Sequence, residues 1–155
     1  AVPALEARLG GSDADERLLA LGALGSLRGD PVAAELVAGL FLDPDTIVAR
    51  NAVLLRARAG DERAAPFLGR MLDRSSYAQD TRLDGGVAGM SEASREASRA
   101  DATEAFLIEA CKAAGLLGGA DLQKPLQTLR EGDPSLKVRS AAIDALHDIE
   151  ATEAR

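Results

Sequence analysis

Apolar residues recur at helical spacing along most of the chain. After Arg17, for example, Ala20, Leu21 and Leu24 fall on one stripe, with polar or small residues between them. Alanine and leucine dominate, and aromatic residues make up only 3% of the sequence, which favours closely packed helices over a β-sandwich or barrel. The pattern predicts an all-α protein.

One stretch of this pattern is repeated. The motif Arg-x-x-Ala-x-x-Ala-Leu begins at Arg17 and again at Arg139, and two weaker copies are aligned on Arg50 and Leu107. Internal repeats of this length are typical of solenoids, in which each unit buries its apolar face against its neighbours. We therefore expect one domain over 1–155, a right-handed α-solenoid of about four helical hairpins. The expected sequence units are 2–30, 31–61, 62–121 and 122–151.

Each unit is predicted to hold a short first helix, an aspartate-rich loop and a longer second helix. Gly29 and Gly60 stand where the second helix must end in a left-handed turn, a conformation that costs glycine little. Asp30 and Asp61 follow them as expected N-caps of the next helix. These residues therefore predict the boundaries between units.

Aligning the four second helices separates core positions from surface positions. Three columns stay apolar and are predicted to be buried. Two columns vary freely and are predicted to face solvent, where any binding specificity should be encoded. The apolar columns are Ala20, Val53, Ala110 and Ala142; Leu21, Leu54, Cys111 and Ile143; and Leu24, Ala57, Ala114 and Leu146. The variable columns are Gly22, Leu55, Lys112 and Asp144, and Ser26, Ala59, Leu116 and Asp148.

The segment Asp-Pro-Ser-Leu-Lys-Val-Arg-Ser-Ala-Ala, from Asp133 to Ala142, resembles the short bacterial HEAT-like repeat, an armadillo-like type also seen in phycobilin lyases. Residues 43–50 carry the same pattern with one residue inserted. The resemblance implies that the second helices line a concave face and that recurring Asp and Arg side chains bond between neighbouring units. It also implies a break in this ladder at Leu107, which stands in place of arginine.

The third unit is about twice as long as the others because of an insertion at 75–100. Residues 75–86 are polar and glycine-broken and predict a loop, whereas residues 91–100 have a helical composition with almost no apolar stripe. Asp101 and Glu104 have the spacing of a capping box, which predicts a new helix start; a continuous helix from Ser91 is the alternative. We expect a flap over the groove or a contact arm, with a tolerated surface loop as the other interpretation.

No catalytic constellation is visible, and we predict a protein that is not an enzyme. Cys111 is the single cysteine and lies in an apolar column, where a thiol behaves as a small hydrophobe. His147 is the single histidine and is expected near a helix end, in a capping or surface role. The acidic runs 13–16 and 43–45 lack the spacing of a calcium loop, so we expect helix capping and no metal or other cofactor.

The net charge of -7 disfavours long-range attraction to nucleic acid or to anionic membranes. The one basic concentration is interspersed with acidic residues and has no aromatic platform, so we expect a mixed solvated face. No stretch approaches the length of an apolar membrane span. We expect neither nucleic-acid binding nor membrane insertion. The basic residues are Arg56, Arg58, Arg63, Arg70 and Arg74.

The chain begins at Ala1 without methionine, so we expect a processed protein or a piece excised from a longer one. Arginine outnumbers lysine 15 to 3, which together with abundant alanine suggests a high-GC bacterial genome. The compartment is not determined: a cytoplasmic location is favoured, and export stays open because the native N-terminus is expected to be missing.

These observations favour a non-catalytic scaffold or adaptor that binds a partner protein through the concave face and the 75–100 insertion. The first alternative, suggested by the repeat type, is a lyase or chaperone-lyase subunit for a tetrapyrrole chromophore, with a polar pocket around His147 or Tyr77. The second is a structural segment of a longer array, with the first helix pair as its open end and the polar tail 150–155 as its cap. The predicted partner contacts are Leu55, Arg58, Tyr77, Lys112, Leu116, Asp144, His147 and Asp148.

Overall fold

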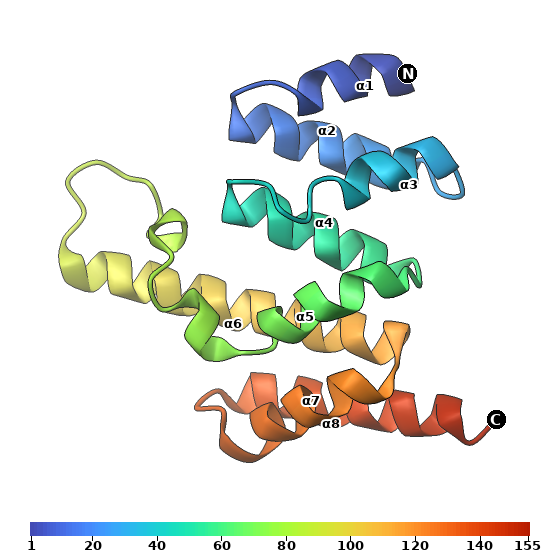
Figure 1. The fold of residues 1–155 in the computed structure, drawn as a ribbon. Helices are drawn as coiled ribbons and strands as arrows, with labels where there is room; N and C mark the ends of the chain where they lie inside the picture. The colour runs from blue at the N-terminus through green and yellow to red at the C-terminus, as the bar shows by residue number, and fades with distance from the viewer.

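The computed structural model describes residues 1–155 and contains eight α-helices, three short 3-10 helices and no strand (Figure 1). The all-α prediction is confirmed. The α-helices are α1 (Val2–Leu9), α2 (Ala14–Ser26), α3 (Pro31–Ala38), α4 (Thr46–Arg58), α5 (Ala65–Met71), α6 (Glu92–Leu117), α7 (Ala120–Gly132) and α8 (Leu136–Glu153). The 3-10 helices are η1 (Glu62–Ala64), η2 (Arg74–Tyr77) and η3 (Thr81–Leu83).

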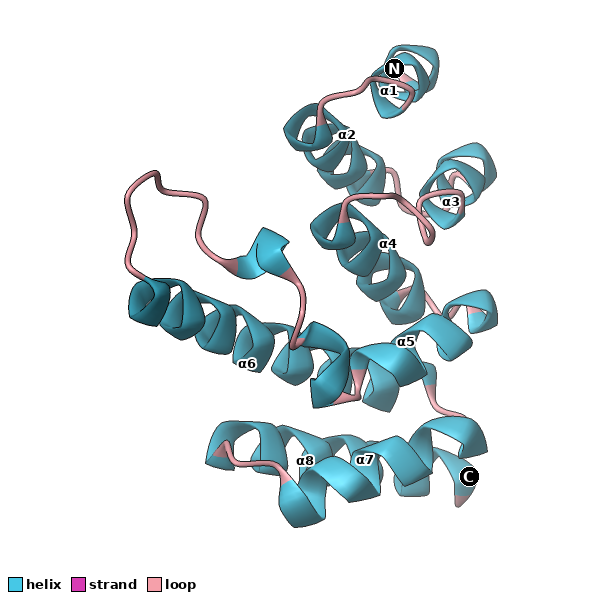
Figure 2. Cartoon of the chain, turned by 60° about the vertical axis from the view of Figure 1, so that its left-hand side comes forward, coloured by secondary structure: helices cyan, strands magenta, loops and turns pink.

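The helices lie in two rows. In one row, α2, α4, α6 and α8 pack on one another in sequence order; in the other, α1 packs on α3 and α5 packs on α7. Figures 1 and 2 show this succession, with the two termini at opposite ends of the molecule. Each odd-numbered helix also packs against the even-numbered helix that follows it. The apolar stripe of an even-numbered helix is therefore covered from more than one side.

Glycine and aspartate residues set the helix ends. Gly29 and Gly60 follow α2 and α4 with φ of 85° and 81°, a left-handed conformation that costs glycine little. Asp30 then accepts hydrogen bonds from the backbone N–H groups of Val32 and Ala33 and so caps α3. The turn residues predicted from the sequence thus separate consecutive units.

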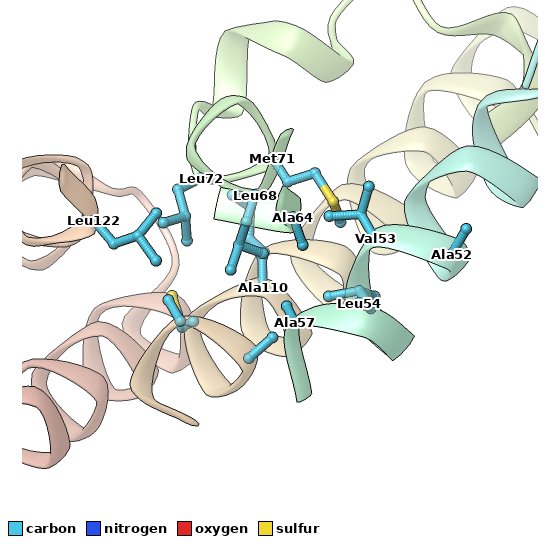
Figure 3. Close-up of a cluster of buried hydrophobic side chains, with 14 of the residues drawn as sticks. Ala52, Val53, Leu54, Ala57, Ala64, Leu68, Met71, Leu72, Ala110 and Leu122 are labelled. Atoms are coloured by element: carbon cyan, nitrogen blue, oxygen red, sulfur yellow. The ribbon is translucent and has the colours of Figure 1, made fainter. Parts of the chain in front are cut away.

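A continuous apolar core runs between the two rows of helices. Two of the three predicted core columns are buried throughout, and the third is buried at Leu21, Leu54 and Cys111. Figure 3 shows a central part of this core, where Val53 of α4 lies near Met71 of α5. Ile143, the last member of the third column, is instead 42% exposed, because α8 packs on α6 and α7 and no further helix covers its other side. The prediction of a buried Ile143 is therefore wrong.

The insertion ends in a continuous helix. Ser91 caps α6 by accepting a hydrogen bond from the Ser94 backbone N–H, and the helix runs without interruption to Leu117. The capping box predicted at Asp101 and Glu104 is wrong: Glu104 instead accepts a 2.7 Å hydrogen bond from the Ser135 hydroxyl of the next unit. The alternative of one helix from Ser91 is the observed one.

Arg–Asp ion pairs with little exposed side chain link successive units. Arg17 of α2 makes two hydrogen bonds of 2.9 Å to the Asp43 carboxylate, which lies just before α4. Arg50 of α4 reaches Asp80 of the insertion at 2.5 Å. The Arg50 guanidinium also lies 4.3 Å from the centre of the Tyr77 ring, a cation–π contact.

In the third unit, an arginine outside the second helix makes the ion pair to the next unit. Leu107 is fully buried and carries no charge, so the expected pairing from α6 is absent. Arg74 of η2 takes its place, with hydrogen bonds of 2.7 and 2.8 Å to the Asp133 carboxylate before α8. The predicted break at Leu107 is therefore present in α6 itself, but Arg74, which immediately precedes the insertion, supplies a guanidinium to Asp133 from outside the helix.

Candidate functional site

The even-numbered helices share one exposed surface, which we call the second-helix face. The two columns predicted to face solvent are exposed at every position except Leu55, which is half-buried. This surface therefore joins side chains that are far apart in the sequence. It consists of Gly22 and Ser26 of α2, Leu55, Arg58 and Ala59 of α4, Lys112 and Leu116 of α6, and Asp144, His147 and Asp148 of α8.

Small residues let neighbouring helices approach closely along this face. A Cβ atom at Gly25 would lie 3.0 Å from a Leu55 methyl carbon, so Leu55 packs over the bare backbone of α2. A Cβ atom at Gly115 would lie 3.1 Å from the Ala145 Cα and 3.1 Å from an Asp148 carboxylate oxygen. Because these separations are shorter than ordinary carbon contacts, a side chain at either glycine would push the helices apart.

Charges of both signs meet at the middle of the second-helix face. Glu109 of α6 accepts hydrogen bonds from Arg58 of α4 and, at 2.9 Å, from Lys112 of its own helix. All three side chains are substantially exposed, so the cluster is accessible to a partner. Glu109 was missing from the predicted contacts; its position three residues before Lys112 on one helix was the available clue.

Leu116 adds an apolar element one turn beyond this cluster. Its side chain is 67% exposed, next to the helix end at Leu117. Asp144, His147 and Asp148 lie exposed on the neighbouring helix α8. The face thus combines one large apolar side chain with acidic and basic groups.

Tyr77 does not belong to this surface. It is 1% exposed, and its hydroxyl donates a 2.7 Å hydrogen bond to the Met71 carbonyl. Burial raises the pKa of the phenol well above its ordinary value. The prediction that Tyr77 contacts a partner from the loop is therefore wrong. The side chain anchors the insertion to the core and stacks on Phe106, with the two ring centres 6.3 Å apart.

The first half of the insertion is fastened to the start of the even-numbered helices. Arg82 bonds to Asp45, the N-cap of α4, at 2.6 Å and to Asp15, in the first turn of α2, at 3.2 Å. Leu83 is buried beside them. This segment, predicted as loop, therefore forms η2 and η3 and packs as part of the fold.

The second half of the insertion projects from the body as an arm, which we define as residues 84–100 (Figure 1). Nearly all of its side chains are exposed, and Val87 is 64% exposed. One brace holds its base, where Arg99 bonds to the Asp84 carboxylate at 2.6 Å. The arm lies beyond the N-terminal ends of α2 and α4, whereas the second-helix face occupies their later turns.

Three of the surface cavities lie away from the second-helix face, and one of them is lined by Asp45 and Arg82. The largest, 540 Å³, is between α5 and α7 and is lined by Lys124 and by the paired Arg74 and Asp133. Two adjoining cavities of 460 and 180 Å³ share Arg50 and Ser76. Charged side chains in these cavities pair with one another: Arg74 pairs with Asp133 in the largest cavity, and Arg50 pairs with Asp80 where the other two meet.

The single cysteine lies in the core. Cys111 is fully buried, and burial raises the pKa of its thiol to about 12, so it stays protonated as a core side chain. No group of three or more His, Cys, Asp or Glu side chains is placed to hold a metal ion. Each helix of the structure is too short or too polar to cross a membrane.

The basic concentration is mostly neutralised within the fold. Arg56 and Arg63 both pair with Asp61, and Arg63 also pairs with Glu35. Arg58 and Arg74 pair as described above, while Arg70 lies over the Phe67 ring at 4.8 Å. These guanidiniums therefore lie within a mixed-charge surface.

No family model matches this chain, and no curated protein sequence matches it either. The candidate site is therefore defined by its own geometry: the second-helix face with Leu116 and the Arg58, Glu109 and Lys112 cluster, and the arm beyond the N-terminal ends of α2 and α4.

Proposed function

We propose that this protein is a right-handed α-solenoid of four HEAT-like helical hairpins that serves as a non-catalytic scaffold for a partner protein. Support for the repeat assignment comes from the recurring motif and from the Arg17 to Asp43 and Arg50 to Asp80 pairs at corresponding places. A solenoid of this kind presents its second helices as one extended, concave surface.

The observation that carries the binding proposal is the contrast between neighbouring columns of the second helices. Positions facing the core keep apolar residues, whereas positions one residue further along change freely from Leu55 to Lys112 to Asp144. Such variation at equivalent exposed positions gives each part of the surface its own chemistry. A polypeptide with one apolar anchor for Leu116 and charges complementary to the Arg58, Glu109 and Lys112 cluster fits this surface best.

The arm provides a second contact region in this proposal. Its exposed residues, which include Val87, extend the surface past the N-terminal ends of α2 and α4. The base is held by Arg99 and Asp84, so the arm has a defined direction and a partner binds it with a small ordering cost.

A pair of matched substitutions tests the proposal. Leu116→Asp places a charge on the second-helix face one turn beyond the charged cluster, whereas Leu42→Asp makes the same change at a side chain that is 80% exposed and lies before α4. Because both leucines are exposed, both variants should melt like the parent. We expect Leu116→Asp to lose the partner captured from a lysate of the source organism, and Leu42→Asp to keep it. Equal capture by both variants would exclude this face.

The chromophore-lyase alternative lacks a specific supporting observation. It predicts a polar pocket around His147 or Tyr77, and neither residue lines any of the three cavities described above. Mixing the protein with a bilin and recording visible absorbance tests it directly; a shifted and enhanced band would favour that function over the scaffold.

A further inference from the structure

Two positions on each second helix point toward the following unit. On α2 these are Arg17, which pairs with Asp43, and Leu21, which is 2% exposed. On α4 the same positions are Arg50, which pairs with Asp80, and Leu54, which is 4% exposed. In α2 and α4, an arginine and an apolar residue one turn later therefore form the contact with the following unit.

The corresponding residues of α8 are Arg139 and Ile143, and no further helix packs on that side of α8. The Nε atom of Arg139 is buried and has no hydrogen-bond partner, whereas the Nε of Arg17 donates to Asp43 at 2.9 Å. Ile143 is 42% exposed, and Leu136 is 73% exposed two turns earlier on the helix. We call Leu136, Arg139 and Ile143 the α8 outer face. Its residues correspond to those by which α2 and α4 contact the following unit, but nothing in the structure packs on them from that side.

The observed pairs define what such a partner must present. Asp43 and Asp133 each stand two residues before the N-cap of a second helix, and each accepts the N-cap backbone N–H at 2.9 Å. This bond holds the carboxylate in place for the arginine of the preceding element. The matching occupant is a helical hairpin with an aspartate at that position and an apolar stripe on the helix that follows.

The α8 helix does not turn at the position where α2 ends. The α2 helix ends before Gly29, whose left-handed turn leads the chain into the next unit. When Arg17 and Arg139 are aligned, the residue that corresponds to Gly29 is Ala151, which lies inside α8. Because the helix continues straight to Glu153, the chain does not turn back over the α8 outer face at that point.

A second copy of this chain is a poor match for the same contact. In the first unit, Asp13 is the N-cap of α2, and the residue two places before it is Gly11. The end of the stack that a second copy would offer therefore lacks the carboxylate. An interface of that kind would also be head-to-tail and open-ended.

We propose that the α8 outer face docks a helical hairpin of a partner protein, with an aspartate two residues before the N-cap of the hairpin's second helix bonded to Arg139. Leu136 and Ile143 pack against the apolar stripe of that helix. This surface is separate from the second-helix face, so the two proposals stand or fall independently.

The chain contains a suitable probe, because residues 30–61 already stack on α2 through Asp43. The full chain is joined at its C-terminus, through a flexible Gly/Ser linker, to a copy of residues 30–61. The tether supplies an effective concentration of about a millimolar, enough to reveal a weak contact. The backbone resonances of α8, followed by nuclear magnetic resonance, report docking of the copied hairpin.

Docking should shift the resonances around Leu136, Arg139 and Ile143. Arg139→Gln in α8, or Asp43→Asn in the copied hairpin, should each lower the docking equilibrium constant about tenfold. The two substitutions together should lower the docking equilibrium constant little more than either one alone, because both remove the same bond. Arg130→Gln, an exposed arginine of α7 paired with Glu131, is the matched control and should leave docking unchanged.

A single hairpin is marginally stable in isolation, so a second probe tethers residues 30–155, whose first unit presents the same Asp43. Unchanged α8 resonances with both probes would overturn the proposal. So would docking that is equally strong in the Arg139→Gln chain, since the arginine would then play no part. Self-association of the untethered full chain that is abolished by Ile143→Asp would also overturn it, by making a second copy the occupant.

Discussion

The molecule uses charged side chains in two different ways on two sides of the same helices. At what we call the loop edge, Arg17, Arg50 and Arg74 pair with aspartates whose side chains are at most 9% exposed. On the second-helix face, Arg58 and Lys112 share Glu109 with about 40% or more of each side chain exposed. The first set holds the stack together, and the second set is free to exchange partners. Burial, rather than residue type, separates the ion pairs of the loop edge from the exposed cluster of the second-helix face.

The largest predicted effect is at the loop edge. Asp133→Asn keeps the shape of the side chain but leaves the Arg74 guanidinium without a counter-charge. Removing one partner of a buried pair is strongly destabilising, so we expect the free energy of unfolding to fall by about 3 kcal/mol. Urea denaturation measures the change. Asp144→Asn, the same substitution on the second-helix face, is the control, and an equal loss in both variants would erase the distinction between the two regions.

A smaller loss is expected where the insertion is anchored. Tyr77→Phe removes the hydroxyl that bonds to the Met71 carbonyl and leaves a buried acceptor unpaired. We expect destabilisation by about 1–2 kcal/mol with the helical content unchanged. Thermal unfolding followed by circular dichroism tests this; a variant as stable as the parent would mean that Tyr77 contributes only by packing.

Acid should weaken the hydrogen bonds that the Asp45 carboxylate accepts at the start of α4. Burial by itself raises the pKa of Asp45, but the bonds from Arg82 and from the Val48 backbone N–H outweigh it and hold that pKa below its ordinary value. A carboxylate with a lowered folded-state pKa stabilises fully above its unfolded-state pKa of about 4, and this contribution is lost as the pH falls further.

Urea midpoints between pH 7 and pH 3 should therefore fall below about pH 4, and Asp45→Asn should flatten part of that slope. Glu104, whose pKa is lowered by hydrogen bonds from Ser135 and Lys137, changes stability in the same direction. Stability that rises on acidification would contradict the assignment of these carboxylates as stabilising when ionised.

The smallest change in stability is expected on the second-helix face. Glu109→Gln breaks an exposed cluster in which solvent screens each charge. We expect the free energy of unfolding to change by less than about 0.5 kcal/mol. The same variant should weaken partner capture, because Arg58 and Lys112 lose their common acceptor. A large loss of stability would instead place Glu109 among the structural pairs.

Much of the fold was predictable because the same pattern of apolar and polar residues recurs along the sequence. Equivalent positions repeat, so the buried stripe through Leu24 and Ala57 and the exposed column through Lys112 could be separated without a homologue. The glycine turns at Gly29 and Gly60 were predictable for the same reason, since φ near 80° restricts the choice of residue.

What the sequence could not predict depends on contacts between distant residues. Nothing in the composition of residues 74–77 indicates that Arg74 replaces the arginine missing at Leu107, or that Tyr77 is buried, because the partners Asp133 and Phe106 lie far along the chain. Ile143 was mispredicted because a repeat pattern cannot tell an inner unit from the last one. Glu109 was missed because only the packing of α4 on α6 brings it to Arg58.

The central claim is that a partner protein binds the second-helix face. A photoreactive amino acid placed at Leu116, and in a separate sample at Leu42, tests it most directly, because both side chains are exposed and only one belongs to the face. After irradiation in a lysate of the source organism, we predict one specific crosslinked product from position 116 that is absent from position 42 and is reduced by Glu109→Gln. The same products from both positions, or none from position 116, would contradict the claim.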